Sequence, residues 1–342
     1  MLITKIYKTE EIDKAADELR KGELIAFPTE TVYGLGADAT NEQAVKRVYL
    51  AKGRPSDNPL IVTVSSFEMM KQYVDDISED AQKLIRHFWP GSLTLIFKIK
   101  PGSLSKAVTG GLETAAFRMP DNSVTRNLID LAGVPLVGPS ANSSGKPSPT
   151  TAKHVFHDLE GRIAGIVDDG PTTVGVESTI LDMSSEVPAI LRPGAVLGEE
   201  IEQLLGKKIL FDRHKVGKTE TPKAPGMKYK HYAPDAQVLI VKHEDWQAAL
   251  EWAKNRAESV GVMALKADLG VNLPNNCIFY DLGTDIHTAS QRLFAGLRYF
   301  DNEQAVNWIL AAAFPEKDLG AAYMNRLRKS AGDSFFENSK LS

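Results

Sequence analysis

A stretch without hydrophobic periodicity, residues 219–230, divides the 342-residue chain into two parts with different patterns. The stretch is rich in proline, glycine and lysine, a composition typical of a linker. At roughly 100–200 residues per domain, the chain on either side is long enough for one domain. We therefore expect domains at residues 1–205 and 236–342, joined by a linker at residues 206–235.

In the first part, strand-like runs and helical segments follow one another irregularly. Residues 10–21 and 41–52 carry apolar side chains at helical spacing, whereas residues 60–64 form a near-continuous apolar run. Further strand-like runs follow up to residue 191, with only short helices between them. This order predicts an α/β domain with a twisted mixed sheet rather than a doubly wound one.

In the second part, strands and helices alternate regularly. Residues 238–241, 260–265 and 277–282 are strand-like. Helical spacing occurs at residues 244–259 and 287–300. Such alternation predicts a smaller Rossmann-like α/β domain with a largely parallel sheet.

The cysteine and histidine content argues against disulfides and metal sites. Cys277 is the only cysteine, so neither an intramolecular disulfide nor a Cys-based zinc finger can form, and a reducing compartment fits. Its strand-like surroundings favour a buried structural thiol over a reactive one. His154 and His157 lie three residues apart on a predicted helix, a pair that by itself favours a helix surface over a metal site. We expect no protein-bound metal.

Charge and hydropathy narrow the functional classes further. The net charge of −4 argues against a chain built mainly to coat nucleic acid or an anionic membrane. No stretch approaches the roughly 20 apolar residues that span a bilayer. The N-terminus lacks the apolar region of a signal peptide. We therefore expect a cytoplasmic protein that does not bind membranes.

Two glycine motifs resemble nucleotide-binding loops but lack the required context. Residues 34–39 match G-x-G-x-x-A, yet the preceding strand is expected to end near Phe27 and the next helix to begin after Asn41. Residues 138–146 resemble a P-loop, but six residues separate the glycines instead of four. Pro147 also occupies the place of the magnesium-binding Ser or Thr. Neither motif predicts its usual ligand here.

Four other stretches carry hydroxyl and basic side chains where strands are expected to end, a common place for binding sites. They are residues 27–36, 52–59, 114–120 and 138–148. Nearby, residues 176–180 and 191–194 add another hydroxyl and another arginine. Together, these stretches predict a polar small-molecule site in the first domain.

Each stretch also has a simpler interpretation. Thr31 and Tyr33 fit the wall of a small-ligand site, but also a turn with threonine caps. Lys52 and Arg54 end a helix, where cations favour the dipole. They would also give a triphosphate a point charge and a rigid fork. Arg118, inside an apolar strand, is costly unless paired. It belongs either to a structural ion pair or to a clamp for a substrate carboxylate.

Taken together, these residues closely resemble the two-domain threonylcarbamoyl-AMP synthases of the YrdC-type family. The resemblance lies in residues 28–36, 52–59 and 138–142, in Glu177-Ser178-Thr179 and in Leu191-Arg192-Pro193-Gly194. These runs include the family's Lys-x-Arg and Ser-x-Asn signatures. The resemblance continues into the linker at Ala224-Pro225-Gly226-Met227 and His231-Tyr232-Ala233-Pro234.

The resemblance implies a YrdC-like catalytic domain at residues 1–205, a linker at residues 206–235 that folds over the active site, and a Rossmann-like domain at residues 236–342. It implies a nucleotidyltransferase, L-threonylcarbamoyladenylate synthase. This enzyme converts ATP, L-threonine and bicarbonate to threonylcarbamoyl-AMP and pyrophosphate, with magnesium (Mg) carried on the ATP. Downstream transferase proteins would pass the threonylcarbamoyl group to an adenosine beside the anticodon of certain tRNAs.

The resemblance also assigns residues to each substrate. Its ATP-binding residues would be Arg54, Asn58, Thr114, Ser140, Ser148, Arg192 and Tyr232. Its L-threonine-binding residues would be Thr31, Thr63, Arg118, Gly138 and Ser178. Lys52 and Arg54 would act at the triphosphate, and Tyr232 would close over the nucleotide. Many members carry His where this chain has Thr63, which would contact threonine through its hydroxyl or a water. With no obvious His base or Cys nucleophile in these loops, catalysis would rest on positioning and charge neutralisation.

Two alternatives belong to other classes. An RNA-binding factor without catalysis would use a basic groove formed by Lys52, Arg54, Lys98, Lys100 and Lys106. The acidic balance and the lack of interleaved exposed aromatic residues argue against it. Carbamoyl adenylation in hydrogenase maturation uses a related domain, but those larger proteins carry Cys zinc fingers, which a single cysteine excludes.

Overall fold

The computed structural model describes residues 2–56, 58–211, 222–223, 231–269 and 273–337. Backbone contacts divide the chain into two units. The first unit comprises residues 1–144, 148–173 and 177–229, and the second unit residues 145–147, 174–176 and 230–342. Much of the expected linker, including residues 212–221 and 224–230, lies outside the described residues, and so does its predicted course over the active site.

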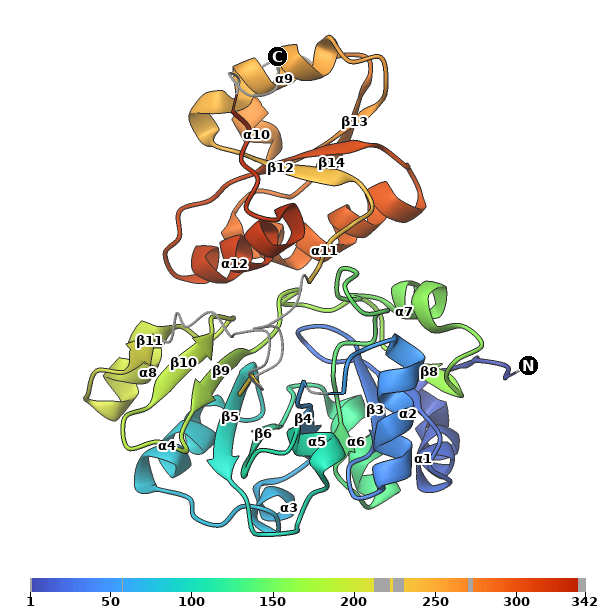
Figure 1. Ribbon diagram of the computed structural model, residues 1–342, viewed down its shortest axis with the longest axis vertical. Helices are drawn as coiled ribbons and strands as arrows, with labels where there is room; N and C mark the ends of the chain where they lie inside the picture. The colour runs from blue at the N-terminus through green and yellow to red at the C-terminus, as the bar shows by residue number, and fades with distance from the viewer. Residues whose placement is uncertain (1, 57, 212–221, 224–230, 270–272, 338–342) are drawn as a thin grey trace. The chain divides into compact units, whose positions relative to one another are not determined.

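The first unit is built on one mixed sheet that has eleven strands within the described residues (Figure 1). From one edge to the other, its strands are β1 (Lys5–Tyr7), β8 (Gly165–Val167), β2 (Ile25–Phe27), β3 (Gly34–Asp38), β7 (Leu136–Val137), β4 (Ile61–Thr63), β6 (Thr114–Arg118), β5 (Leu93–Lys98), β9 (Thr179–Asp182), β10 (Ala189–Arg192) and β11 (Leu210–Phe211). Parallel pairs such as β4 with β6 alternate with antiparallel pairs such as β5 with β6. The predicted α/β unit with a mixed sheet is confirmed.

Helices cover both faces of this sheet. They are α1 (Ile12–Arg20), α2 (Glu42–Lys52), α3 (Phe67–Lys71), α4 (Glu79–Phe88), α5 (Lys106–Thr109), α6 (Ser123–Ala132), α7 (Ala152–Leu159) and α8 (Gly198–Leu205). Short 3-10 turns occur at Thr9–Glu11 and, in the second unit, at His243–Asp245. Among the helices of the described residues, none has both the length and the apolar character needed to cross a membrane.

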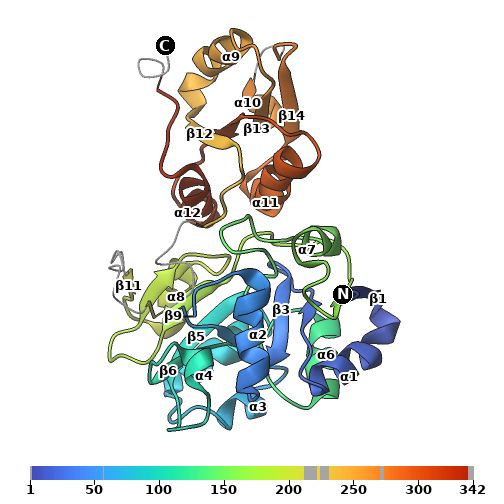
Figure 2. The ribbon, with the colours of Figure 1, turned by 45° about the vertical axis from the view of Figure 1, so that its right-hand side comes forward.

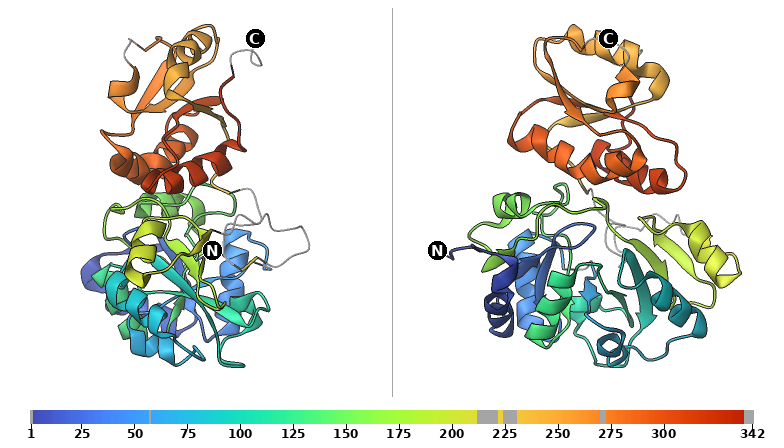
Figure 3. Two further views of the ribbon diagram at one scale, coloured as in Figure 1. Left: turned by 90° about the vertical axis from the view of Figure 1, so that its left-hand side faces the viewer. Right: turned by 180° about the vertical axis from the view of Figure 1, so that it is seen from behind.

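Strand β2 shows how the sheet separates two hydrophobic cores. Successive side chains of a strand point to opposite faces. Ile25 and Phe27 pack in one core with α1 and α6, which lie side by side in Figures 2 and 3. Ala26 faces the opposite core, to which α2 contributes Val45 and Val48.

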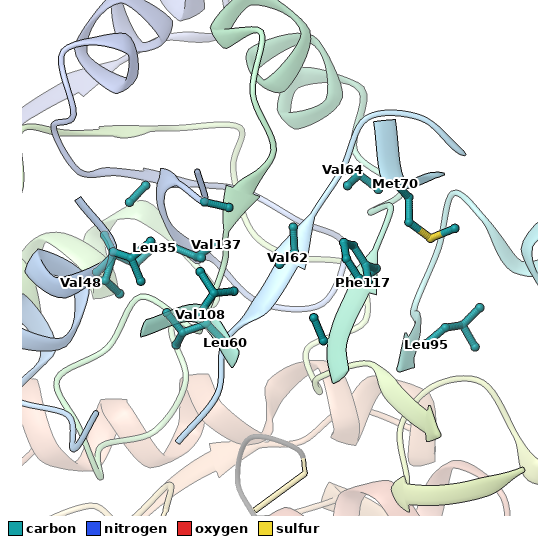
Figure 4. Close-up of a cluster of buried hydrophobic side chains, with 14 of the residues drawn as sticks. Leu35, Val48, Leu60, Val62, Val64, Met70, Leu95, Val108, Phe117 and Val137 are labelled. Atoms are coloured by element: carbon teal, nitrogen blue, oxygen red, sulfur yellow. The ribbon is translucent and has the colours of Figure 1, made fainter. Parts of the chain in front are cut away.

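The core on the α2 side of this sheet fixes the strands that lead into the predicted site. Val62 of β4, Phe117 of β6 and Val137 of β7 are fully buried in it (Figure 4). Burying each such side chain stabilises the fold by roughly 1.5–3 kcal/mol. Each of the three is followed directly in the chain by a residue that the family resemblance assigns to threonine binding. The core therefore holds the backbone of that site in place.

The glycines of the false dinucleotide motif serve the packing of β3 on β2. A Cβ on Gly34 would lie 2.6 Å from Phe27 Cζ, and one on Gly36 would lie 2.8 Å from the Ile25 carbonyl oxygen. Both glycines belong to the antiparallel pairing of β3 with β2. They permit close strand packing and do not form the strand-to-helix turn that a dinucleotide fingerprint requires.

The second unit contains a separate sheet with four parallel strands in its described part. In spatial order these are β12 (Gln237–Val241), β15 (Trp308–Ala312), β13 (Val260–Ala264) and β14 (Cys277–Asp281). Helices α9 (Trp246–Lys254) and α10 (Lys266–Leu269) cover one face, and α11 (Ile286–Asn302) and α12 (Leu319–Ala331) cover the other (Figure 1). This three-layer arrangement confirms the predicted Rossmann-like unit.

Cys277, at the start of β14, is partly buried rather than fully buried as expected, and it should still react slowly with alkylating reagents. Burial raises the pKa of its thiol to about 11. Because the thiolate is the nucleophile, we expect iodoacetamide to modify the folded protein at pH 8 about a hundredfold more slowly than the urea-unfolded protein. The rate should rise through pH 11. Mass spectrometry of timed samples measures it, and equal rates for folded and unfolded protein would contradict the assignment of a structural thiol.

Candidate active site

The predicted threonine-binding residues meet at one end of the central strands. Strands β4 and β6 run parallel, with Thr63 opposite Arg118. After β7, the backbone N–H of Gly138 donates to the Ile61 carbonyl at 2.8 Å. A Cβ on Gly138 would lie only 2.5 Å from Thr63 Oγ1. Glycine is therefore needed at this position to leave room beside the Thr63 hydroxyl.

Arg118 is the most constrained charge of this group. Its Nη1 donates to Thr31 Oγ1 at 2.8 Å, and its Nε donates to the Gly91 carbonyl at 3.2 Å. Nη2 lies 2.6 Å from Glu30 Oε1, and both side chains are only 10% exposed. Glu30 Oε1 also accepts a hydrogen bond from Ser92 Oγ at 2.8 Å. The structural ion pair considered for Arg118 is therefore present.

One donor of Arg118 stays without a hydrogen bond despite the ion pair. The contact of Nη2 with Glu30 lacks hydrogen-bond alignment, and Nη2 has no hydrogen-bond acceptor within the described part of the chain. A substrate carboxylate would satisfy this donor and add a second negative charge to a guanidinium that is already oriented. The ion pair and the carboxylate clamp are thus compatible roles of one side chain.

Ser178 is held from two sides. Its hydroxyl lies 2.7 Å from Thr94 Oγ1 on β5. Arg192, which is only 6% exposed, donates from Nε and Nη2 to the Ser178 carbonyl at 3.1 and 3.0 Å. Nη2 also donates to the Ser178 hydroxyl at 3.2 Å. A residue assigned to ATP thus orients a residue assigned to threonine.

Lys52 ends α2 but does not extend into solvent. The residue is 3% exposed, and its Nζ donates to the carbonyls of Ser140 and Asn142, the latter at 2.6 Å. Ser140 Oγ donates in turn to Asn142 Oδ1 at 2.6 Å. The lysine of the Lys-x-Arg signature therefore positions the Ser-x-Asn signature. Its action at a triphosphate stays a prediction.

Asn58 contributes an unsatisfied acceptor near the second member of the Lys-x-Arg signature. Arg54 Nη2 donates to the Pro59 carbonyl at 3.3 Å, one residue beyond Asn58. The Asn58 residue is 1% exposed, and its Oδ1 has no hydrogen-bond partner within the residues that the structure describes. A buried acceptor without a partner costs roughly 1–3 kcal/mol. A ligand donor at this position would offset that cost.

Strand β6 connects the two groups of predicted residues. Thr114, Ala116 and Arg118 share one face of the strand because side chains alternate. Thr114 and Arg118 are four residues apart, a distance of about 13 Å along a strand. ATP and threonine residues therefore lie at opposite ends of the same strand, with a small alanine between them.

Ser148 and Tyr232, which are also assigned to ATP, belong to different units. Ser148 is fully buried, and its hydroxyl donates to Glu177 Oε1 at 2.6 Å in the first unit. Tyr232 belongs to the second unit, where its ring lies 5.1 Å from that of Phe294. Its backbone has a φ of 65°, which is uncommon outside glycine. That Tyr232 closes over a nucleotide stays a prediction.

Sequence reasoning did not single out three residues of this site. Glu30 holds Arg118, Asn142 is held by Lys52, and Glu177 accepts from Ser148. Each lies in a stretch that the sequence analysis singled out, but none was assigned a role in binding or positioning. The one usable signal was the carboxylate of Glu30 inside a hydroxyl-rich stretch, since a buried arginine elsewhere needs such a partner.

The described residues contain no cluster of three or more His, Cys, Asp or Glu side chains able to hold a metal ion. His154 instead lies with its Nδ1 3.3 Å from Thr150 Oγ1. His157 is exposed and lies beside Asp158, with its Nδ1 3.2 Å from the carboxylate.

The mixed sheet with its buried Arg, Thr and Ser side chains, together with a unit built on a parallel sheet, places the chain among two-domain proteins of the YrdC type. The family model described as "Telomere recombination", for the Sua5, YciO and YrdC proteins, matches residues 17–194. The model described as "Threonylcarbamoyl-AMP synthase, C-terminal domain" matches residues 196–332. The chain belongs to the threonylcarbamoyl-AMP synthase family, a family of nucleotidyltransferases.

Individual relatives agree with this family over nearly the whole chain. The threonylcarbamoyl-AMP synthase of Bacillus subtilis is 47% identical over 94% of this chain and 93% of its own length. That of Pyrococcus abyssi is 44% identical over 93% of each chain. The crystal structure of Pyrococcus abyssi Sua5 complexed with L-threonine has a TM-score of 0.89 at 42% identity, and the match covers 98% of this chain and 99% of that one.

Replacing Glu30 should show how much its carboxylate stabilises the buried Arg118 side chain. Glu30→Gln leaves the buried guanidinium without its countercharge, so we expect the free energy of unfolding to fall by about 3 kcal/mol. Glu23→Gln is the matched control, because the Glu23–Arg47 pair is more exposed, with side chains 29% and 41% exposed. That variant should lose about 1 kcal/mol or less. Urea denaturation measures the free energy of unfolding of both variants. Equal small decreases would show that Glu30 does not stabilise the buried Arg118 side chain.

Proposed function

We propose that this protein joins ATP, L-threonine and bicarbonate into threonylcarbamoyl-AMP and pyrophosphate. The observation that carries the proposal is the oriented, buried guanidinium of Arg118 among the hydroxyls of Thr31 and Thr63. Such a group suits a small amino acid that carries a carboxylate and a hydroxyl of its own. Membership in the threonylcarbamoyl-AMP synthase family supports the same activity.

The proposed reaction needs little chemistry from side chains. The amine of threonine adds to carbon dioxide derived from bicarbonate and forms a carbamate. A carbamate oxygen then attacks the α-phosphorus of ATP, and the bond to pyrophosphate breaks. We assign the threonine carboxylate to Arg118 and the phosphates to Arg54 with Lys52. Binding ATP and threonine along one rigid strand, β6, would orient the carbamate toward the α-phosphorus, and such orientation is worth roughly 7–11 kcal/mol.

Magnesium is proposed to arrive with ATP. It usually retains several waters and binds through few protein ligands when phosphates are present. The Asn58 Oδ1 oxygen, which lacks a hydrogen-bond partner among the described residues, fits a nucleotide hydroxyl or a magnesium-bound water. The ion would neutralise charge on the phosphates, while Arg54 and Lys52 orient them.

The product suits a cytoplasmic tRNA-modification pathway. Threonylcarbamoyl-AMP is a mixed anhydride, so a transferase must accept its acyl group before water does. We propose downstream transferase proteins as partners that deliver the group to tRNA. The RNA-binding alternative gains no support from its proposed groove. Lys52 is buried, and Lys100 Nζ donates to the carbonyls of Lys71 and Gln72 at 2.9 and 3.2 Å.

Amino-acid selectivity tests the proposed function directly. The full-length protein, incubated with ATP, magnesium and bicarbonate, should release pyrophosphate only when an amino acid is supplied. We expect serine, which lacks the methyl group, to have a kcat/KM about 10–200-fold below that of threonine. Valine, which lacks the hydroxyl, should fall about 10⁴-fold if Thr63 or its neighbours hydrogen-bond that group. No release with any amino acid from a folded protein would overturn the proposal.

Arg54 should be required for turnover but not for folding. Removing a preorganised cation at the phosphates by Arg54→Ala should lower kcat/KM by at least about a hundredfold. Lys46→Ala is the matched control, because Lys46 lies on the same helix α2 with a side chain that is 53% exposed. It should keep full activity. Unchanged turnover in a folded Arg54→Ala protein would exclude the phosphate role.

A further inference from the structure

The second unit contains two short segments that come from the N-terminal part of the chain. These are residues 145–147 and residues 174–176. The first is followed directly by Ser148 and the second by Glu177, and both of these belong to the first unit. The contacts of each segment show which residues of the second unit hold it.

Arg298 on α11 holds the first segment at its last residue. The arginine is 3% exposed. Its Nε and Nη2 donate to the Pro147 carbonyl at 3.1 and 2.6 Å. Hydrogen bonds from a buried charged group are worth more than neutral ones. The two bonds converge on one oxygen, so they restrain the orientation of that carbonyl as well as its position.

The lysine of the P-loop-like motif is bound in the same segment. Lys146 Nζ lies 2.6 Å from Asp235 Oδ1 and 3.1 Å from Asp301 Oδ2, and Asp301 follows Arg298 by one turn of helix. Burial alone would lower the pKa of Lys146, but its hydrogen bonds to Asp235 and Asp301 raise it above the ordinary value. The Gly145 carbonyl accepts from the backbone N–H of Ala233 at 2.9 Å. This motif thus anchors residues 145–147 to the second unit.

The second segment packs on α11 and on α12. Gly175 has a φ of +79°, and a Cβ there would lie 2.3 Å from the Cα of Gln291 on α11. Val176 is fully buried with Leu319 and Ala322 of α12. Helices α11 and α12 lie side by side beneath the four-stranded sheet (Figures 1 and 2). Both segments are therefore held by α11, and the second is held by α12 as well.

Chain continuity carries this restraint to the predicted nucleotide site. The Pro147 carbonyl and the Ser148 N–H belong to one planar peptide group. Holding the carbonyl therefore orients the start of Ser148. Glu177, which accepts the Ser148 hydroxyl at 2.6 Å, follows Val176 in the same way. The Ser148–Glu177 pair is thus restrained through both of its chain neighbours.

We propose that Arg298 is a positioning residue for ATP, acting through the Pro147 carbonyl on Ser148. The proposal rests on the proposed function, because it takes Ser148 as an ATP ligand. It assigns the second unit a part in nucleotide affinity that is separate from any closure of the linker. Threonine affinity should depend on Arg298 much less, since none of the residues assigned to threonine adjoins Pro147 in the chain.

Full-length Arg298→Ala tests this role by calorimetric titration with ATP and magnesium and by steady-state kinetics. We expect the ATP Kd and KM to rise tenfold or more, while the threonine KM changes less than twofold. Arg298→Lys, which keeps a charged donor but loses the fork, should recover part of the affinity. Arg292→Ala is the matched control on the same helix, because its side chain is 45% exposed beside Asp281. It should leave both constants unchanged.

An unchanged ATP Kd in a folded Arg298→Ala protein would overturn the proposal, as would equal losses for ATP and threonine. If Arg298→Ala does not fold, Arg298→Lys replaces it, since this variant loses the two-donor fork at the Pro147 carbonyl. It should raise the ATP Kd in the same direction, and an unchanged value there would equally overturn the role. The titration measures ATP binding and needs no turnover. A wild-type protein that binds ATP without releasing pyrophosphate would therefore refute the proposed function, while the ATP Kd values of the variants would still decide the role of Arg298.

Discussion

A single buried guanidinium determines how the centre of the first unit is built. Arg118 occupies a strand whose neighbouring side chain, Phe117, is fully buried in the core. Burying an arginine without compensation would cost several kcal/mol. The fold offsets this cost with Glu30, Thr31 and the Gly91 carbonyl, which come from two loops far apart in sequence. The contacts with Arg118 therefore help to fix the conformation of both loops, and the two loops together form the polar end of the site.

The alternation of side chains along strands then distributes structure and chemistry. Val62 and Phe117 face the core, and Thr63 and Arg118 face the opposite side. A shift of register by one residue in either strand would turn the polar pair into the apolar core and the apolar pair toward the polar site. The same residues that stabilise the sheet thus prevent such a shift. Precision at the site follows from core packing, with no separate scaffold needed.

Much of this arrangement was predictable from sequence, and the exceptions share a physical cause. The mixed sheet, the parallel second sheet and the importance of Arg118 follow from periodicity and from the cost of burying charge. The partners of Lys52 did not follow, because a lysine at a helix end has an adequate explanation in the helix dipole. Its burial among the carbonyls of Ser140 and Asn142 depends on a loop almost ninety residues away. Long-range polar contacts leave no periodic signal in a single sequence.

The same limit applies to the domain boundary expected near residue 205. Residues 145–147 and 174–176 carry no periodicity that would separate them from their neighbours, yet they pack with the second unit. A single boundary in the sequence cannot separate the two units, because each of them contains more than one stretch of the chain. Val176 is fully buried through contacts with α12, so a chain cut after residue 205 would expose it and leave Lys146 without Asp301. Such a fragment would also lose the restraints on the peptide groups that lead into Ser148 and Glu177.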